Sequence, residues 1–326
     1  MASCALVGDT PLVGLTRRTP DDRDSRRVLD LAHDVWRRDR YRMNFETSFG
    51  TLAWQGGPAA GCTQVFERGG ELVGWARLTP GYDRIRRMEV WDRAPASMVW
   101  LADRRDPAAA ETLRSIVEWA EERTEEPFTT SHALGDVAAE AIFEQLGYRP
   151  DPSEPFGIYL EQPLPAASAP PLEGYVFTTM ADLNNDADLR AEAHRVGWPA
   201  STQTADDFRA TMATWPYRPD LDIIVTTHDG SPVGSTIIWY NHSYAYGEFE
   251  PVGTAADHRR RGVAAAMLRF GLQRLAAAGA SHAVVGARGD EDYPVPRRLY
   301  ASVGFRHFTT QQIVRKTVRS QPHVST

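Results

Sequence analysis

The sequence has few cysteines and no long apolar run. Its only cysteines are Cys4 and Cys62, which excludes a small fold built on several disulfides and favours a reducing, cytoplasmic location. The longest apolar stretch, 263–280, is interrupted by Arg269 and Arg274, and it falls short of the roughly 18 uncharged residues typical of a membrane span. The N-terminus lacks the basic and apolar regions of a secretory signal. We therefore expect neither export nor a membrane partner.

An excess of basic charge is also absent. Lysine and arginine together number 36 against 43 aspartates and glutamates, which gives a net charge of −7. Because nucleic-acid binding requires a basic face, this balance argues against a nucleic-acid partner. The chain has 42% hydrophobic and 24% charged residues, which is typical of a globular protein. Its length of 326 residues predicts about two domains.

A proline-rich stretch divides the chain. Residues 161–173 contain four prolines, which can neither pair in a sheet nor continue a helix, so we expect an exposed tether. This places one domain at 1–160, called the N-terminal half, and another at 174–318, called the C-terminal half. A short tail is expected at 319–326.

The two halves resemble each other. Residues 71–78 are similar to 231–238, each following a glycine-containing turn, and 143–148 are similar to 300–305. In the C-terminal half the patterns predict helices over 181–196, 204–214, 262–278 and 296–303, and strands over 221–227, 233–240, 244–250 and 283–286, followed by two final strands between 305 and 318. Strands that alternate with helices around a mixed sheet indicate an α+β fold.

The most informative segment lies at 250–264. Here a strand leads into a loop with three arginines and a helix that begins at Gly262. The free N–H groups and positive dipole end of such a helix form an anion site, and a glycine allows the backbone to approach the ligand closely. An exposed basic helix start with no ligand is the alternative interpretation.

The pattern Arg259-x-x-Gly262-x-Ala264 resembles the pyrophosphate-binding motif of the GCN5-related N-acetyltransferase (GNAT) superfamily, and 299–305 resembles its last helix-to-strand signature. The resemblance implies two tandem GNAT-like domains, each a mixed, mostly antiparallel sheet flanked by helices. It implies acetyl-CoA as co-substrate, with no metal. The residues implied in donor binding are Val252, Gly253, Thr254, Arg259, Arg260, Arg261, Gly262, Val263 and Ala264.

The same resemblance implies direct transfer to an amine. Tyr300 stands where the family usually places the acid that protonates the leaving thiolate, and Glu250 is our candidate acceptor of the amine proton. Glu248, His242 and His258 are alternative bases. The segment 289–298 departs from the family pattern, because it has two prolines and no asparagine before the tyrosine, so Arg297 or Arg298 would have to compensate.

The N-terminal half has lost these features. Sliding it by 155 residues places Pro107, preceded by Asp106, at the glycine position, and proline has no N–H to offer while a carboxylate repels phosphate. In the match of 143–148 with 300–305, Tyr300 becomes Phe143, which has no proton to give. We expect a degenerate copy without a donor site, in which His132, Trp100 and Trp119 are core residues.

These observations predict an acetyl-CoA-dependent N-acetyltransferase that acts on a primary amine of a small molecule, as a monomer or homodimer. A non-catalytic module that binds acyl-CoA or a partner is the alternative. Aromatic residues that could line an acceptor cleft are Trp198, Trp215, Tyr217, Tyr240, Tyr244 and Tyr246.

Overall fold

The computed structural model describes residues 14–21, 23–39, 62–86, 89–166 and 172–316. The N-terminal half contributes β1 (Leu15–Arg18), α1 (Asp24–Asp39), β2 (Cys62–Arg68), β3 (Glu71–Thr79), β4 (Tyr82–Arg86), β5 (Glu89–Ala94), β6 (Ala96–Ala102), α3 (Ala109–Glu121), β7 (Phe128–Ala133), α4 (Val137–Gln145), β8 (Tyr148–Pro150) and β9 (Gly157–Pro163).

The C-terminal half has a similar order of elements, without a counterpart of the hairpin β4–β5. It contributes β10 (Tyr175–Thr179), α5 (Ala187–Gly197), α6 (Ala205–Met212), β11 (Asp222–Thr227), β12 (Pro232–Asn241), β13 (Tyr246–Thr254), α7 (Val263–Ala277), β14 (His282–Arg288), α8 (Val295–Val303) and β15 (Arg306–Lys316). The predicted α+β class is confirmed.

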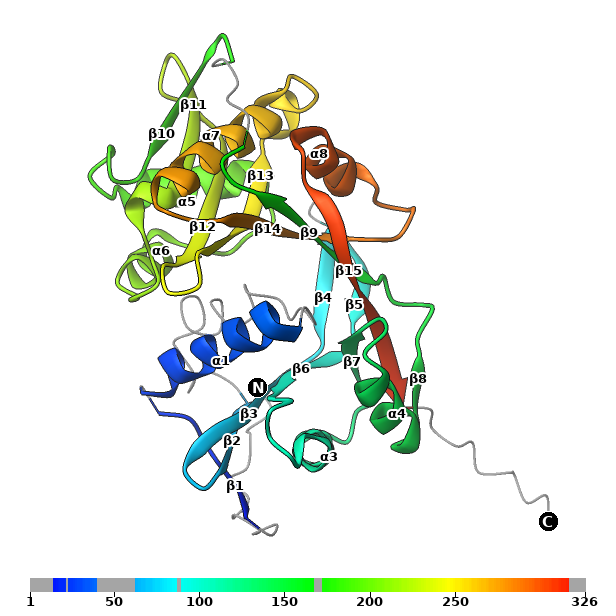
Figure 1. Ribbon diagram of the computed structural model, residues 1–326. Coiled ribbons are helices and arrows are strands. Elements are labelled where there is room, and N and C mark those ends of the chain that lie inside the picture. Colours follow the sequence, from blue (N-terminus) through cyan, green and yellow to red (C-terminus); the bar gives the residue numbers. More distant parts are fainter. Residues whose placement is uncertain (1–13, 22, 40–61, 87–88, 167–171, 317–326) are drawn as a thin grey trace, which may run out of the picture.

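Within the described residues, thirteen strands form one continuous sheet. Their order is β1-β2-β3-β6-β7-β15-β9-β14-β13-β12-β11-β10, with β8 paired to β15; β4 and β5 form a separate hairpin. In each half one parallel pair, β6 with β7 and β13 with β14, interrupts an otherwise antiparallel arrangement. The sheet therefore runs through both halves (Figure 1).

The halves are joined because each contributes a strand to the other. β9, from the N-terminal half, pairs with β14 along its whole length, from Gly157↔Arg288 to Pro163↔His282. β15 first pairs with β9 and then continues to β7 and β8, so it spans both halves in Figure 1. Two final strands had been predicted between 305 and 318; β15 is instead one strand, because its second part lies in the other half's sheet.

The predicted tether also differs from the structure. Glu161, Gln162 and Pro163 lie in β9 and pair with Val284, Ala283 and His282. The prediction that this stretch stays outside any sheet is thus wrong for its first three residues, because a proline at the end of a strand leaves the preceding ladder intact. Residues 167–171 lie outside the described residues.

Helix α5 begins six residues later than predicted. Asn184 and Asn185 have φ angles of 52° and 57°, in the left-handed region, which a right-handed helix cannot contain. The Asp186 side chain then accepts hydrogen bonds from the N–H groups of Asp188 and Leu189 and caps the helix. Helical spacing alone does not reveal this capped start.

In both halves helices cover both faces of the sheet. Ser235 of β12 donates to the carbonyl oxygen of Ala193 in α5, whereas Ile238 packs against Gly271 in α7, so α5 and α7 lie on opposite faces. We call these the α5 face and the α7 face. In the N-terminal half, α1 packs on Val65 and Trp75, whereas α3 packs on the opposite side, with Phe66 in its core.

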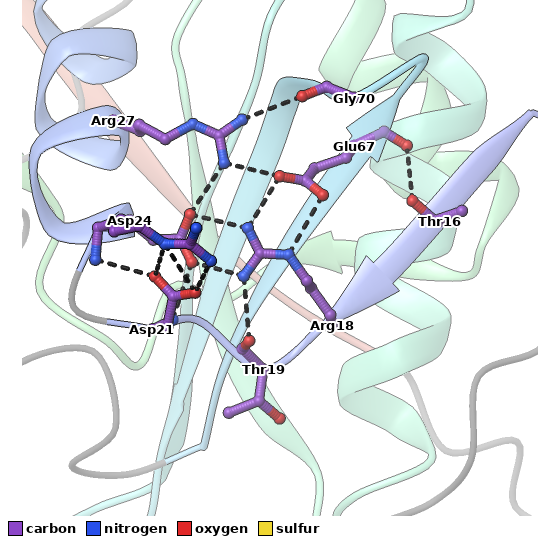
Figure 2. A network of polar contacts seen from close by, with 9 residues as sticks. Thr16, Arg18, Thr19, Asp21, Asp24, Arg27, Glu67 and Gly70 are labelled. Carbon is purple, nitrogen blue, oxygen red and sulfur yellow. Dashed lines mark hydrogen bonds and ion pairs between the residues drawn. The ribbon is translucent and has the colours of Figure 1, made fainter.

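Helix α1 is tied to the strands below it by an ionic network (Figure 2). Asp24, at its start, is fully buried and accepts hydrogen bonds from Arg18, Arg27 and the N–H of Asp21. Burial favours the neutral carboxyl, but these donors outweigh it and lower the pKa of Asp24 below its usual value. The Glu67 carboxylate, on β2, also accepts hydrogen bonds from Arg18 and Arg27.

The opposite side of α1 packs on the C-terminal half. Trp36 meets Tyr246 of β13 edge-to-face, with ring centroids 3.9 Å apart, and Asn241 lies 2.8 Å from Nδ1 of His33. Trp36 and Leu29 belong to the same buried cluster as Trp239 and Val284. The N-terminal half therefore covers the α5 face of the other half's sheet at the end where β13 begins.

Two further findings concern location. Cys62 is disulfide-bonded, with its partner outside the described residues. The low cysteine count therefore does not support a reducing compartment, since two cysteines suffice for one bridge. Over the residues that the structure describes, no helix is both long and apolar enough to cross a bilayer.

We predict that the two halves stay associated when the chain is cut between them. Residues 167–171 would be replaced by a protease recognition sequence and cleaved in the purified protein. Because β9 stays paired with β14, and β15 with β7 and β8, both fragments should elute together at the mass of the uncut chain in size-exclusion chromatography. Separation into two half-size peaks would contradict the strand exchange.

Candidate active site

The parallel strands β13 and β14 pair over a short distance and then separate. Their pairs are Tyr246↔His282, Gly247↔Ala283 and Glu248↔Val284, and no further pair between them occurs among the described residues. Beyond this point β13 stays paired with β12, and β14 with β9. The edge of 250–254 that faces away from β12 therefore borders a gap in the sheet.

A β-bulge marks the point of separation. Thr236 pairs with Val252 and Ile238 with Phe249, so Glu250 and Pro251 together lie opposite a single residue. Pro251 has no N–H and cannot extend a ladder. The indole nitrogen of Trp239 donates to the carbonyl oxygen of Glu250, at 2.9 Å, which holds the bulge against β12.

Glu250 and Tyr300 come together at this bulge. Tyr300, on α8, is buried, with its ring centroid 6.1 Å from that of Phe305, and Glu250 is half-buried. Burial, and then the negative charge of Glu250, raise the pKa of Tyr300 above its usual value. The hydroxyl is consequently protonated at neutral pH and lies within electrostatic reach of the Glu250 carboxylate.

The basic loop lies at the far end of β13. Arg260 and Gly262 adopt positive φ angles, of 60° and 84°, and Gly262 is the N-cap of α7, with no side chain capping the helix start. Arg259 donates to the carbonyl oxygen of Thr254, and all three arginines are exposed. Three exposed arginines thus precede a helix start that no described side chain caps.

The other predicted bases lie elsewhere. Glu248 is buried where β13 and β14 still pair. His242 is exposed in the turn between β12 and β13, at the opposite end of β13 from the basic loop. His258 lies in that loop, where Nδ1 is 3.0 Å from the Tyr175 hydroxyl. Of these groups, Glu250 is the one whose charge acts on Tyr300.

The equivalent place in the N-terminal half is closed by its own side chains. β6 and β7 also separate after two pairs, but the Thr130 hydroxyl donates to the carbonyl of Met98, and the Trp100 indole to that of Ser131, each at 2.9 Å. Phe143 packs on Trp100, with ring centroids 5.6 Å apart. As predicted, Trp100, Trp119 and His132 are buried.

At the start of α3, a carboxylate of the chain itself lies at the helix N-terminus. The buried Asp106 carboxylate accepts hydrogen bonds from the N–H of Ala108, the hydroxyl of Thr112 and the guanidinium of Arg68. The sequence predicted that Asp106 repels phosphate. In the structure this carboxylate occupies the helix N-terminus itself.

Arg297 was predicted to compensate for the missing asparagine, and several aromatic residues were predicted to line an acceptor cleft. Arg297 donates to the carbonyl of Gly289 and pairs with Glu291, so its charge is already engaged. Tyr217 is buried and donates to Asp222, whereas Trp215 is exposed. Trp198 lies against Gly253.

Sequence reasoning did not single out Tyr159, whose ring lies against Gly286 of β14. A glycine inside a strand, as in 283–286, was the available signal, because it often marks the close approach of another group.

Across the described ranges, no group of three or more His, Cys, Asp and Glu side chains is arranged to hold a metal ion. The features that the site does offer are an open strand edge, a carboxylate beside a buried phenol, and an uncapped helix N-terminus.

Comparisons with known proteins agree with this geometry. Residues 187–305 match the model of the acetyltransferase (GNAT) family. The fold is similar to that of a GCN5-related N-acetyltransferase from Sphaerobacter thermophilus, at 19% identity over 94% of this chain and 96% of that one, with a TM-score of 0.60. It is equally similar to a tandem GNAT protein from the clavulanic acid biosynthesis pathway, at 15% identity over 92% and 98%, with a TM-score of 0.60.

A more distant likeness extends to an acyltransferase with its donor bound. Saccharomyces cerevisiae N-myristoyltransferase, solved with myristoyl-CoA, shares 12% identity over 96% of this chain and 82% of that one, with a TM-score of 0.55. None of the curated proteins matches. At these identities the solved structures establish the fold, and the family match covers the half that carries Glu250, Gly262 and Tyr300. Residues 187–305 thus match the acetyltransferase (GNAT) family, and the fold of the chain is similar to that of a tandem GNAT protein.

Proposed function

We propose that the C-terminal half transfers an acetyl group from acetyl-CoA to a primary amine of a small molecule, directly and without an acyl-enzyme. The observation that carries the proposal is the separation of β13 from β14 after Glu248↔Val284, which leaves a free strand edge beside Glu250 and Tyr300. The GNAT family match supports acyl transfer in general, and the amine acceptor is our inference.

The residues at the donor end suit a pyrophosphate-bearing thioester. The N–H groups from Arg260 to Ala264 would hold the pyrophosphate, with Arg259 and Arg261 adding positive charge. Among the described residues, a Cβ on Gly262 would meet nothing closer than Cδ1 of Leu172, at 3.8 Å. The pantetheine arm would pair with the free edge at 252–254.

The chemistry follows from the protonation of two side chains. Bound acetyl-CoA would supply the activated acyl group. Glu250, half-buried at the bulge, accepts the proton that the acceptor's ammonium group must lose before its nitrogen can attack the thioester. Tyr300 keeps its proton at neutral pH and donates it to the departing sulfur. A backbone N–H of β13 beyond the bulge, on the edge at 252–254, would stabilise the developing oxyanion.

The N-terminal half supports the same proposal by contrast. In it, Asp106 fills the helix N-terminus, Trp100 and Thr130 bridge the separated strands, and Phe143 replaces the tyrosine. An acyl-CoA would have to displace an internal carboxylate that is already bound by Arg68 and Thr112. We therefore infer one donor site in each chain.

Donor binding should depend on Gly262. Gly262→Ala places a side chain at φ 84°, which costs about 1–2 kcal/mol in backbone energy, and fills space that the pyrophosphate needs. We expect the Kd for CoA in calorimetry to rise at least about tenfold, equivalent to ~1.4 kcal/mol. Gly230→Ala is the matched control, because Gly230 has φ 89° in an open turn far along the chain. Equal effects of both variants on CoA affinity would refute a donor site at Gly262.

Turnover should depend on the Tyr300 hydroxyl. Tyr300→Phe keeps the ring in its core position and removes the acidic proton, so kcat should fall roughly 10²-fold, within the range of a general acid, at nearly unchanged CoA affinity. Tyr293→Phe removes an exposed hydroxyl nearby and serves as the control. Thiol release from acetyl-CoA, with an amine chosen from a screen, provides the assay. Wild-type kcat in Tyr300→Phe would exclude Tyr300 as the acid, whereas no turnover by the wild type with any amine would favour the non-catalytic module.

The pH–rate profile should depend on Glu250. Glu250→Gln keeps the size of the side chain but cannot take a proton, so the amine must then arrive already neutral. We expect kcat/KM of the variant to rise continuously with pH towards the pKa of the free amine, whereas the wild type levels off at lower pH. Glu248→Gln tests the alternative base in the same assay. Identical profiles for wild type and Glu250→Gln would exclude Glu250 as the base.

A further inference from the structure

The strands that border the gap each carry a glycine facing the α5 side of the sheet. Gly253 of β13 lies against Gly197 and Trp198 at the end of α5. Gly286 of β14 lies two residues after Val284 and therefore faces the same side of the sheet. Val284 packs in the cluster of Trp36 and Trp239 on the α5 face. Neither glycine has a positive φ, so backbone conformation does not explain them. Each of the two glycines instead has an aromatic ring lying against its backbone.

Trp198 covers the first glycine. A Cβ on Gly253 would lie 2.2 Å from Cζ3 of Trp198, so no residue with a side chain fits beneath the ring. The indole also stacks on His194, with centroids 4.7 Å apart and planes 18° apart. His194 is positioned by Ser201, whose hydroxyl lies 3.0 Å from Nε2, and burial lowers its pKa to about 4, so the stack is neutral at pH 7. The ring is thus held at the edge of the gap.

Tyr159 covers the second glycine from the other half of the chain. It belongs to β9 and pairs with Gly286, and a Cβ there would lie 3.2 Å from Cε1 of its ring. Tyr159 is buried in the cluster that also contains Trp36. Because β9 has crossed from the N-terminal half, this wall of the gap is supplied by the half that lacks a donor site.

Two sides of the bulge, the α7 face and the start of β13, are filled by buried side chains. Phe249, Val285 and Tyr300 are buried in the core on the α7 face. Towards the start of β13, Glu248 and Val284 close the ladder, and Tyr246 packs on Trp36. A group attached to the thioester and held between Glu250 and Tyr300 can therefore extend towards the α5 face, where it meets Trp198 and Tyr159.

We propose that Trp198 and Tyr159 set the size of the acyl group and restrict it to a short chain such as acetyl. The inference rests on the proposed function and specifies its donor. Burial of additional methylene groups alone would strengthen binding, by ~0.8 kcal/mol each. If a longer acyl-CoA binds more weakly than acetyl-CoA, the two rings therefore exclude the longer acyl chain.

The test compares the affinities of three probes for the full chain in calorimetry: CoA, acetyl-CoA and hexanoyl-CoA. The wild type should bind hexanoyl-CoA at least about tenfold more weakly than acetyl-CoA, a difference of ~1.4 kcal/mol. Trp198→Ala and Tyr159→Leu should each remove most of this ratio, while Trp215→Ala, which alters an exposed tryptophan beside Arg26, should leave it unchanged. Melting temperatures identify variants that do not fold.

A double variant checks the ring contact itself. Gly253→Ala should alter the ratio of hexanoyl-CoA affinity to acetyl-CoA affinity, because the new Cβ displaces the Trp198 ring. The same substitution should have no further effect on this ratio in Trp198→Ala, because the ring atoms that the Cβ would contact are absent. Equal wild-type affinity for both thioesters would overturn the inference, as would an unchanged ratio in Trp198→Ala. A wild type that binds acetyl-CoA without chain-length preference leaves the proposed function standing, whereas one that binds neither CoA nor its thioesters removes both.

Discussion

The exchange of β9 and β15 is the constraint on which the rest of the structure depends. The backbone groups of β14 that face away from the gap find their partners on β9, and the end of β15 completes the sheet of the N-terminal half. An unpaired strand edge leaves a row of unsatisfied donors and acceptors, so neither half is complete without the other's strand. The gap between β13 and β14 is held open because each strand has a firm partner on its far side.

The two halves differ in what lies at the N-terminus of the helix that follows the strand bordering the gap. In both, a helix follows the strand that borders a gap, and its first N–H groups need acceptors. At α7 these groups follow Gly262 and three exposed arginines, and no side chain caps them. At α3, Asp106 accepts from Ala108 and Thr112 and is neutralised by Arg68. The difference between a binding site and a closed copy depends on a few residues at the same position in the fold.

The retained copy has physical roles even without donor chemistry. Its helix α1, anchored by Arg18, Asp24 and Glu67, packs Trp36 against the sheet of the other half. Its last strand places Tyr159 beside the gap. Deleting the N-terminal half would therefore expose a buried sheet face as well as a strand edge, which accounts for its persistence as a complete fold.

Local patterns in the sequence determined the α+β class, the internal repeat, the turn at Gly262 and the loss of the glycine at Pro107, because periodicity and backbone requirements are encoded over short stretches. That Glu250 and Tyr300 belong to one site was expected from a family resemblance, since the two residues lie 50 positions apart, and the structure places them within electrostatic reach of each other. The late start of α5 depended on two left-handed asparagines, which hydrophobic spacing does not register. Only the tertiary structure decided that β15 is a single strand shared by both halves and that Tyr159 faces Gly286. Strand pairing joins residues more than a hundred positions apart, and no local pattern specifies which edge a strand will find.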